Sequence, residues 1–170
     1  MSLGGRRGRA KDFESSPERA KERALRLLSV RSRSHAELFR RLRMAGFAEP
    51  DIDSALAALE AVGLVDDERF AQELATHEVG GRLAGRRAAL ASLRKAGVAR
   101  DLAERAVEEV SGEDEEARAE ELARSRLGRL GTLPPEAAYR RLLGFLQRRG
   151  YSGETARTVC RRVLERLEQD

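Results

Sequence analysis

Apolar residues recur along most of the chain at intervals of three and four positions, and Arg and Glu fill many of the positions between them. This period predicts amphipathic helices, and no segment shows the strict alternation that is typical of a half-buried strand. Turn signals divide the pattern into nine expected helices, with breaks at Gly46, Gly63, Gly80-Gly81 and residues 132–135 among others. The pattern therefore predicts an all-α chain.

Two serines mark expected helix starts near the N-terminus. Ser16 is followed by Pro17 and an acidic residue, which is typical of an N-cap and a first helical turn. Ser34 is followed three residues later by Glu37, the spacing of a capping box. We expect both hydroxyls to accept hydrogen bonds from backbone N–H groups of the helices that they precede.

One helix-turn-helix pattern occurs three times in the same register. In each copy a Gly ends a helix, and the three glycines, Gly46, Gly97 and Gly150, are 51 and 53 residues apart. Each follows a Leu by four residues and precedes an apolar residue. The equivalent Leu residues are Leu42, Leu93 and Leu146, and the equivalent apolar residues are Phe47, Val98 and Tyr151. Self-similarity of this length predicts an array of like structural units.

We therefore predict three tandem three-helix repeats, each resembling a helix-turn-helix, which form an elongated, curved array. The repeats are expected over residues 17–64, 65–112 and 113–170, after a disordered basic N-terminal tail over residues 1–16. Three short helices bury little apolar area against the entropy lost on folding, so neighbouring repeats should contact each other.

Composition narrows the class of protein further. Of 170 residues, 33 are Lys or Arg and only three of these are Lys, although 29 acidic residues reduce the net charge to +4. Cys160 is the single cysteine, so no disulfide can form within the chain. No stretch approaches the roughly 20 apolar residues of a membrane helix. We expect a cytoplasmic protein with no membrane contact.

Basic residues recur on equivalent helices of the three expected repeats. The sets are Arg40, Arg41 and Arg43; Arg86, Arg87, Arg94 and Lys95; and Arg140, Arg141, Arg148 and Arg149. Like-charged faces at regular spacing suit a regular acidic partner, such as a nucleic-acid backbone or a polymer of protein subunits on one. Any single Arg is explained as well by a solvated helix surface with an ion pair to a nearby Glu. The recurrence leaves both interpretations open.

Candidate catalytic and metal-binding groups are few. The acidic strings at 66–68 and 113–116 are explained by helix N-termini, which favour carboxylates. His35, His77 and Cys160 lack the spacing of metal ligands, and Cys160 falls on an apolar stripe. No phosphate-binding loop of the P-loop or dinucleotide type occurs. We therefore expect no enzymatic activity, no metal and no cofactor.

Four segments carry more specific strings. The first is Leu25–Ser29 followed by Ser34–Leu38, and the second is Gly63–Ala71, which reads Gly-Leu-Val-Asp-Asp-Glu-Arg-Phe-Ala. The third runs from Gly85 to Val98 and ends in Lys-Ala-Gly-Val, and the fourth is Arg148–Ser152, Arg-Arg-Gly-Tyr-Ser. In this order they resemble the RecX family, the regulatory proteins of RecA recombinase, over nearly the whole chain.

The resemblance has three departures. Val65 stands where the family more often has Leu or Ile, Ala96 interrupts a plainer Lys-Gly form, and Tyr151 replaces Phe. The resemblance implies a non-enzymatic regulator, mainly an inhibitor, that binds the groove of the RecA–DNA filament and modulates recombination, DNA repair and the SOS response. It also implies binding to single- and double-stranded DNA, and we expect a monomer. The contact residues proposed above come from the charge pattern and not from the family.

Two other functions stay open at this point. One is a general nucleic-acid-binding helical module that acts without a recombinase, which the sequence pI near 9.8 supports. The other is a protein-only adaptor that takes a partner helix, although no large exposed apolar stripe is evident once the core faces are assigned.

Overall fold

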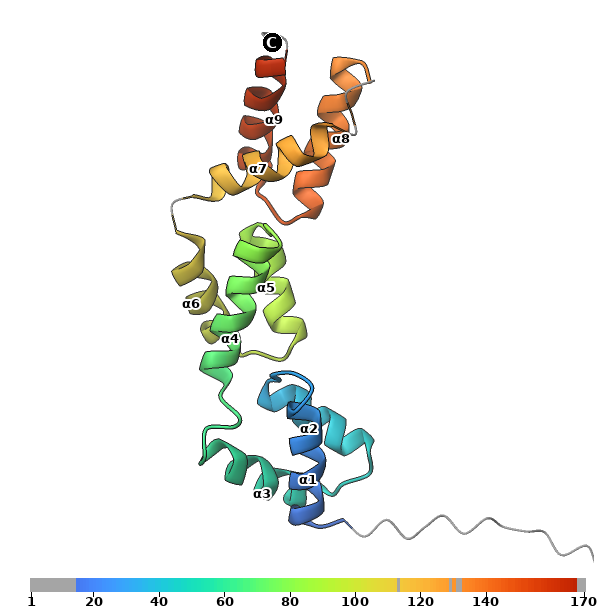
Figure 1. Cartoon of the computed structure of the whole chain (residues 1–170), viewed down its shortest axis with the longest axis vertical. Coiled ribbons are helices and arrows are strands. Elements are labelled where there is room, and N and C mark those ends of the chain that lie inside the picture. Colours follow the sequence, from blue (N-terminus) through green and yellow to red (C-terminus); the bar gives the residue numbers. More distant parts are fainter. Residues whose placement is uncertain (1–14, 113, 129, 131–132, 168–170) are drawn as a thin grey trace, which may run out of the picture. The chain divides into compact units, whose positions relative to one another are not determined.

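The protein is built from helices joined by short turns (Figure 1). The computed structural model describes residues 15–112, 114–128, 130 and 133–167. Its elements are α1 (Pro17–Leu28), α2 (His35–Met44), α3 (Glu49–Glu60), α4 (Asp67–Thr76), the π-helical turn η1 (His77–Gly81), α5 (Arg86–Lys95), α6 (Arg100–Ser111), α7 (Glu115–Leu127), α8 (Pro135–Arg148) and α9 (Gly153–Leu167). No described residue lies in a strand, so the predicted all-α class is confirmed. Of the tail predicted over residues 1–16, residues 1–14 lie outside the described residues.

The chain folds into two compact units, one ending at Asp66 and the other beginning at Asp67. The first unit holds α1, α2 and α3 around one hydrophobic cluster. The second unit holds two clusters, one among α4, η1, α5 and α6 and the other among α7, α8 and α9. The division into repeats at 17–64, 65–112 and 113–170 stays a prediction, as does the curvature expected of such an array.

Both predicted N-caps form in the first unit. The Ser16 hydroxyl accepts a hydrogen bond from the N–H of Arg19 at 3.3 Å, and the Ser34 hydroxyl accepts one from the N–H of Glu37 at 3.1 Å. These bonds satisfy backbone donors that a helix N-terminus otherwise leaves free. The caps fix where α1 and α2 begin, and hence which of their side chains reach the core. Fully buried core residues are Ala20, Ala24, Leu38, Leu42, Ile52, Leu56 and Leu59.

The three aligned glycines have nearly the same geometry. Gly46, Gly97 and Gly150 have φ of 94°, 89° and 91°, the left-handed conformation that ends a helix. In each case the N–H of the next residue donates to the carbonyl of the aligned Leu, at 3.2, 3.1 and 3.2 Å. These are Schellman motifs, in which the residue after the glycine packs on that Leu. The Leu and apolar residues of all three motifs are buried. The repeated pattern read from the sequence is therefore a repeated helix ending.

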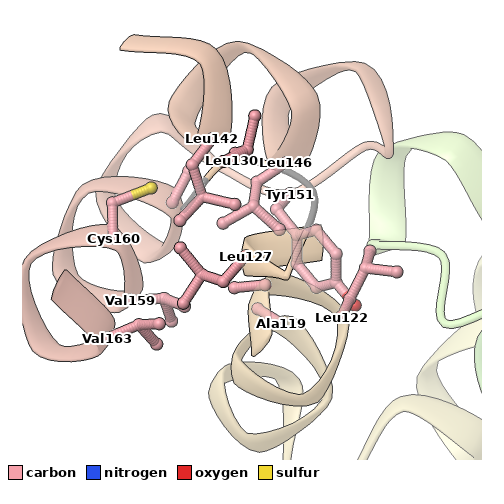
Figure 2. Packing of buried hydrophobic residues seen from close by; sticks show 12 residues of the cluster. Ala119, Leu122, Leu127, Leu130, Leu142, Leu146, Tyr151, Val159, Cys160 and Val163 are labelled. Atoms are coloured by element: carbon pink, nitrogen blue, oxygen red, sulfur yellow. The ribbon is translucent and has the colours of Figure 1, made fainter. Parts of the chain in front are cut away.

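The third cluster shows how such an ending closes a core (Figure 2). Leu142 and Leu146 of α8 and Val159 and Val163 of α9 pack in one core with residues of α7, among them Leu127. Tyr151, directly after Gly150, is 1% exposed, and its hydroxyl donates to the carbonyl of Leu83 at 2.9 Å. Burial raises the pKa of Tyr151 to about 12. Tyr151 thus closes the third cluster and reaches the segment that precedes α5.

The second and third clusters are joined through two glycines. The N–H of Gly85 donates to the carbonyl of Arg149 at 2.9 Å. A Cβ atom added to Gly85 would lie 2.5 Å from the Gly150 carbonyl carbon, and one added to Gly150 would overlap the Ala88 backbone. Only residues without a side chain allow the two backbones to approach this closely. The turn between α8 and α9 therefore packs directly on the start of α5.

One predicted break is wrong. Gly80 and Gly81 were expected to separate two helices, but they lie inside the π-helical turn η1, which continues α4. The wide turn closes with bonds from the Arg82 N–H to the His77 carbonyl and from the Ala84 N–H to the Glu78 carbonyl, both at 2.9 Å. The break follows at residues 82–85, where Leu83 has a positive φ of 48°. Among the described residues, no helix has the length and apolar character needed to cross a membrane.

Candidate nucleic-acid interface

The first basic set lies on α2, and its three side chains are exposed. Arg40 is exposed and has no polar partner in the described part of the chain. Arg41 and Arg43, by contrast, pair with carboxylates: Arg41 with Glu37 at 2.8 Å and Arg43 with Glu49 at 3.7 Å. Only part of this set is therefore free to meet a partner without breaking an existing contact.

Glu37 forms an unexpected charge cluster in the same unit. Its side chain is 6% exposed and accepts hydrogen bonds from Arg31, Arg33 and Arg41. Burial alone would raise the pKa of Glu37, but the hydrogen bonds from Arg41 and Arg31 and the nearby positive charge outweigh it and lower that pKa. Three guanidinium groups around one carboxylate leave a local charge of +2. Arg31 and Arg33 were not predicted, although Arg33 and Arg41 flank Glu37 at four-residue spacing.

The three arginines of the second basic set line a hollow of about 390 Å³ at the start of α5. Arg86, Arg87 and Arg94 line it, together with Glu115, Tyr151 and other residues of the α8–α9 turn. Arg86 pairs with Glu108 at 3.2 Å, and its backbone N–H donates to the Glu115 carboxylate at 3.3 Å. Arg87 donates to the carbonyl of Gln147 at 2.7 Å. This hollow is therefore already occupied in part by acidic and carbonyl groups.

One member of the second set and one member of the third set line neither of the arginine hollows. Lys95 is exposed near the end of α5, and Arg149 is half-buried where its carbonyl contacts Gly85. Arg94 lines the α5 hollow and donates through Nε to the carbonyl of Leu90 at 3.3 Å.

The third basic set has no carboxylate partner among the described residues. Arg140, Arg141 and Arg148 of α8 line a hollow of about 560 Å³ with Arg126 of α7 and Phe145. None of these four arginines forms an ion pair with any described carboxylate. The Arg126 guanidinium carbon lies 5.2 Å from the centre of the Phe145 ring, within the range of a cation–π contact. We call this group of four arginines and Phe145 the α8 hollow.

A different arrangement occurs on α9. Arg162 and Arg166 contact the Glu120 carboxylate of α7 at 3.3 and 2.5 Å, and Arg124 contacts it at 2.5 Å. Burial would raise the pKa of Glu120, but these arginines lower it overall. The arginines of α9 therefore hold α7 in place by ion pairs, whereas those of the α8 hollow form no ion pair within the described residues.

The 11 predicted contact residues divide clearly by these contacts. Three pair with carboxylates, namely Arg41, Arg43 and Arg86. The other eight form no ion pair in the ranges that the structure describes. Arg126 was missed because it lies on a helix that carries Leu and Ala on one side and alternating charges elsewhere, with no signal to separate it from Arg124. Binding by any of these residues stays a prediction.

The remaining candidate groups do not gather into a site. No group of three or more His, Cys, Asp or Glu residues within the searched, described positions is arranged to hold a metal ion. Cys160 is buried, and burial raises the pKa of its thiol to about 11, so the thiolate is scarce at neutral pH. His35 lies 3.6 Å from Glu60 on the surface of the first unit.

These features define a class of protein. It is an all-α protein in which one helix-turn-helix pattern recurs, and several arginines on its helices have no carboxylate partner among the described residues. Residues 20–59 match the first three-helix domain of RecX, and residues 113–160 match the third. The regulatory protein RecX of Amycolatopsis mediterranei (strain U-32) is 41% identical over 151 residues, which cover 89% of this chain and 86% of that protein. The RecX of Thermobifida fusca (strain YX) is 40% identical over 147 residues, 86% of this chain and 80% of that one. The chain therefore belongs to the RecX family.

Solved structures agree on the fold. The crystal structure of RecX from Lactobacillus salivarius superposes with a TM-score of 0.75 at 19% identity, covering 86% of this chain and 96% of that one. The resemblance seen in four sequence strings is thereby confirmed as family membership, and the helical-repeat fold is confirmed with it.

Proposed function

We propose that this protein regulates RecA recombinase, mainly as an inhibitor, by binding in the groove of the RecA–DNA filament. Its relatives carry the name of regulatory protein RecX, which supports a regulatory role. The single observation that carries the proposal further is the α8 hollow, where four arginines face outward without a carboxylate among the described residues.

Uncompensated arginines suit a filament groove for a physical reason. Guanidinium groups bind phosphates and carboxylates bidentately, and each neutralised phosphate releases condensed counterions. A groove that exposes both DNA and repeated protein subunits offers such groups at regular intervals. Several weak contacts on linked repeats then add through effective concentration, so no single site needs high affinity.

We propose that the protein inhibits by binding an inactive state of the filament better than the active one. A protein that binds one state of a filament better than its free components shifts the population toward that state. It does so without breaking or forming a covalent bond, and we propose that the protein acts as a non-enzymatic monomer in the cytoplasm, without metal or cofactor.

The test is ATP hydrolysis by RecA on single-stranded DNA, measured with the protein at stoichiometric amounts. We expect the rate to fall and strand exchange to slow. The double variant Arg141→Gln/Arg148→Gln should inhibit less. The matched control, Arg100→Gln/Arg105→Gln on α6, removes the same charge outside the α8 hollow and should inhibit as the unaltered protein does. Unchanged hydrolysis and strand exchange with the unaltered protein would refute the proposal.

A general nucleic-acid-binding module is the second candidate, and the aromatic ring in the α8 hollow favours it. Such a module would bind bare DNA tightly with a steep salt dependence and would not distinguish DNA from recombinase-coated DNA.

A further inference from the structure

The α8 hollow has a composition that a simple phosphate contact does not require. Its volume of about 560 Å³ lies within the range of about 300–1,000 Å³ that is usual for pockets that take a small ligand. Its wall combines four guanidinium groups with a phenyl ring and the side chains of Leu130 and Ala137. A phosphate needs the guanidinium groups alone, whereas the apolar wall suits a planar, weakly polar group.

The arginines are placed along one side of α8. Arg141 and Arg148 are seven residues apart, so they lie on the same helix face about 10.5 Å from each other along the axis. The side chain of Arg148 extends over Gly144. A Cβ atom added to Gly144 would lie 3.2 Å from the Nη1 atom of Arg148. Because Gly144 has no side chain, the Arg148 guanidinium can lie close to the helix surface at the edge of the hollow. Because Arg148 reaches back toward Arg141, both charges lie on one helix face, where phosphates of a single strand can meet them.

The Phe145 ring and the Arg126 guanidinium both line the α8 hollow. Phe145 is half-buried and packs on the third hydrophobic cluster, which fixes its orientation. The Arg126 guanidinium lies over one face of the ring, 5.2 Å from its centre, and adds a second planar group to the wall. Bases stack on aromatic rings and on guanidinium planes, and this stacking tolerates any base.

We infer that the α8 hollow binds an unpaired nucleotide of a nucleic-acid strand, with Arg141 and Arg148 on its phosphates and its base against Phe145 and Arg126. A duplex keeps its bases stacked inside the helix, so it could use the arginines but not the ring. An acidic protein surface could likewise use the charges, but it has no need of the apolar wall. The inference rests on the proposed function, because the unpaired nucleotide is the part of the RecA–DNA filament that the α8 hollow would contact.

The first arm of the test measures binding to a fluorescent 15-nucleotide oligo(dT) over a range of salt concentrations, without recombinase. Each phosphate contact on a single strand contributes about 0.7 to the slope of log affinity against log salt. The double variant Arg141→Gln/Arg148→Gln should therefore reduce the slope by about 1.4 and the affinity at least ten-fold. The control Arg100→Gln/Arg105→Gln, with the same loss of charge, should change neither by a comparable amount. Equal losses in both variants would overturn the inference.

The second arm isolates stacking by comparing oligo(dT) with an abasic strand that has the same number of phosphates. The unaltered protein should prefer oligo(dT) by about five-fold or more. Phe145→Leu keeps an apolar side chain of similar size and should remove this preference, and Arg126→Gln, which leaves the core intact, should weaken it. Circular dichroism checks that each variant is folded. No preference in the unaltered protein would overturn the inference.

The outcomes separate this inference from the proposed function. If the double variant keeps its affinity for oligo(dT) but binds recombinase-coated DNA more weakly, the hollow takes an acidic protein surface and the inference is wrong. If oligo(dT) binding depends on the hollow as described while RecA activity is unaffected by the protein, the inference stands and the proposed function is wrong.

Discussion

Replacing Gly85 with Ala tests the backbone contact between the α8–α9 turn and the start of α5. The new methyl carbon would lie 2.5 Å from the Gly150 carbonyl carbon and from the Tyr151 nitrogen, and neither is a flexible side chain. Gly85 itself has φ of −69°, so Ala adopts its backbone conformation without strain. The overlap is therefore the only new conflict that the substitution introduces at the joint.

The size of the effect follows from what the overlap displaces. Overpacking costs about 1–3 kcal/mol. If the two backbones move apart to remove the overlap, the Gly85–Arg149 and Tyr151–Leu83 hydrogen bonds break. Each of these bonds contributes about 1 kcal/mol. We therefore expect Gly85→Ala to reduce the free energy of unfolding by about 2–3 kcal/mol.

Gly80→Ala is the matched control, because it makes the same chemical change five residues earlier in the same unit. A Cβ at Gly80 meets nothing within 4 Å, and its φ is not in the left-handed region. Ala there should be neutral or should stabilise by about 0.5–1 kcal/mol, since it restricts the unfolded chain. The assay is urea unfolding followed by circular dichroism and by tyrosine fluorescence, with Tyr139→Phe in the background so that Tyr151 alone reports. Equal stability of the two variants would refute the close packing of Gly85 on Gly150.

Three further predictions concern the cores and the buried charges. Glu37→Gln should destabilise the first unit by about 3 kcal/mol at neutral pH, because Arg33 would remain buried with a weaker partner. Since the pKa of Glu37 is lowered from 4.5 on folding, its contribution to the free energy of unfolding should be complete above that value and should disappear as the pH falls through the lowered pKa. The stabilities of the variant and the unaltered protein should therefore converge in acid. A difference in stability that persists unchanged at low pH would contradict this. Leu42→Asp should unfold the first unit, because it buries an unpaired charge at a fully buried position, and unaltered circular dichroism and melting would show that the core assignment is wrong. Cys160 should react with a thiol reagent at pH 8 far more slowly in the folded protein than in urea, and equal rates would contradict its burial and raised pKa.

The sequence predicts the helix endings well because they depend on local chemistry. Gly46 and its two equivalents need a left-handed conformation, and the aligned Leu four residues earlier supplies the matching hydrophobic contact. The Ser16 and Ser34 caps likewise require only the next three residues. The wrong break at Gly80-Gly81 shows the limit of such rules, since a wide turn accommodates both glycines when the N–H groups of Arg82 and Ala84 donate to earlier carbonyls.

Contacts between distant segments could not be predicted in the same way. Nothing local distinguishes Gly85 from other loop glycines, because its need to be small arises from Gly150, 65 residues later. Glu37 looked like an exposed capping residue, and its burial depends on arginines in the turn between α1 and α2. Arg126 joins the α8 hollow only because α7 packs beside α8. The charge pattern pointed to Arg140, Arg141 and Arg148 of α8, but not to Arg126, which joins them from the neighbouring helix.

Binding to bare single-stranded DNA and to RecA-coated single-stranded DNA, compared at one fixed salt concentration, tests the proposed filament regulation most directly. If the protein acts on the filament, it should bind the coated DNA at least ten-fold more tightly, since subunits and phosphates then contribute together. Equal affinity for the two, or tighter binding to bare DNA, would contradict regulation through the filament.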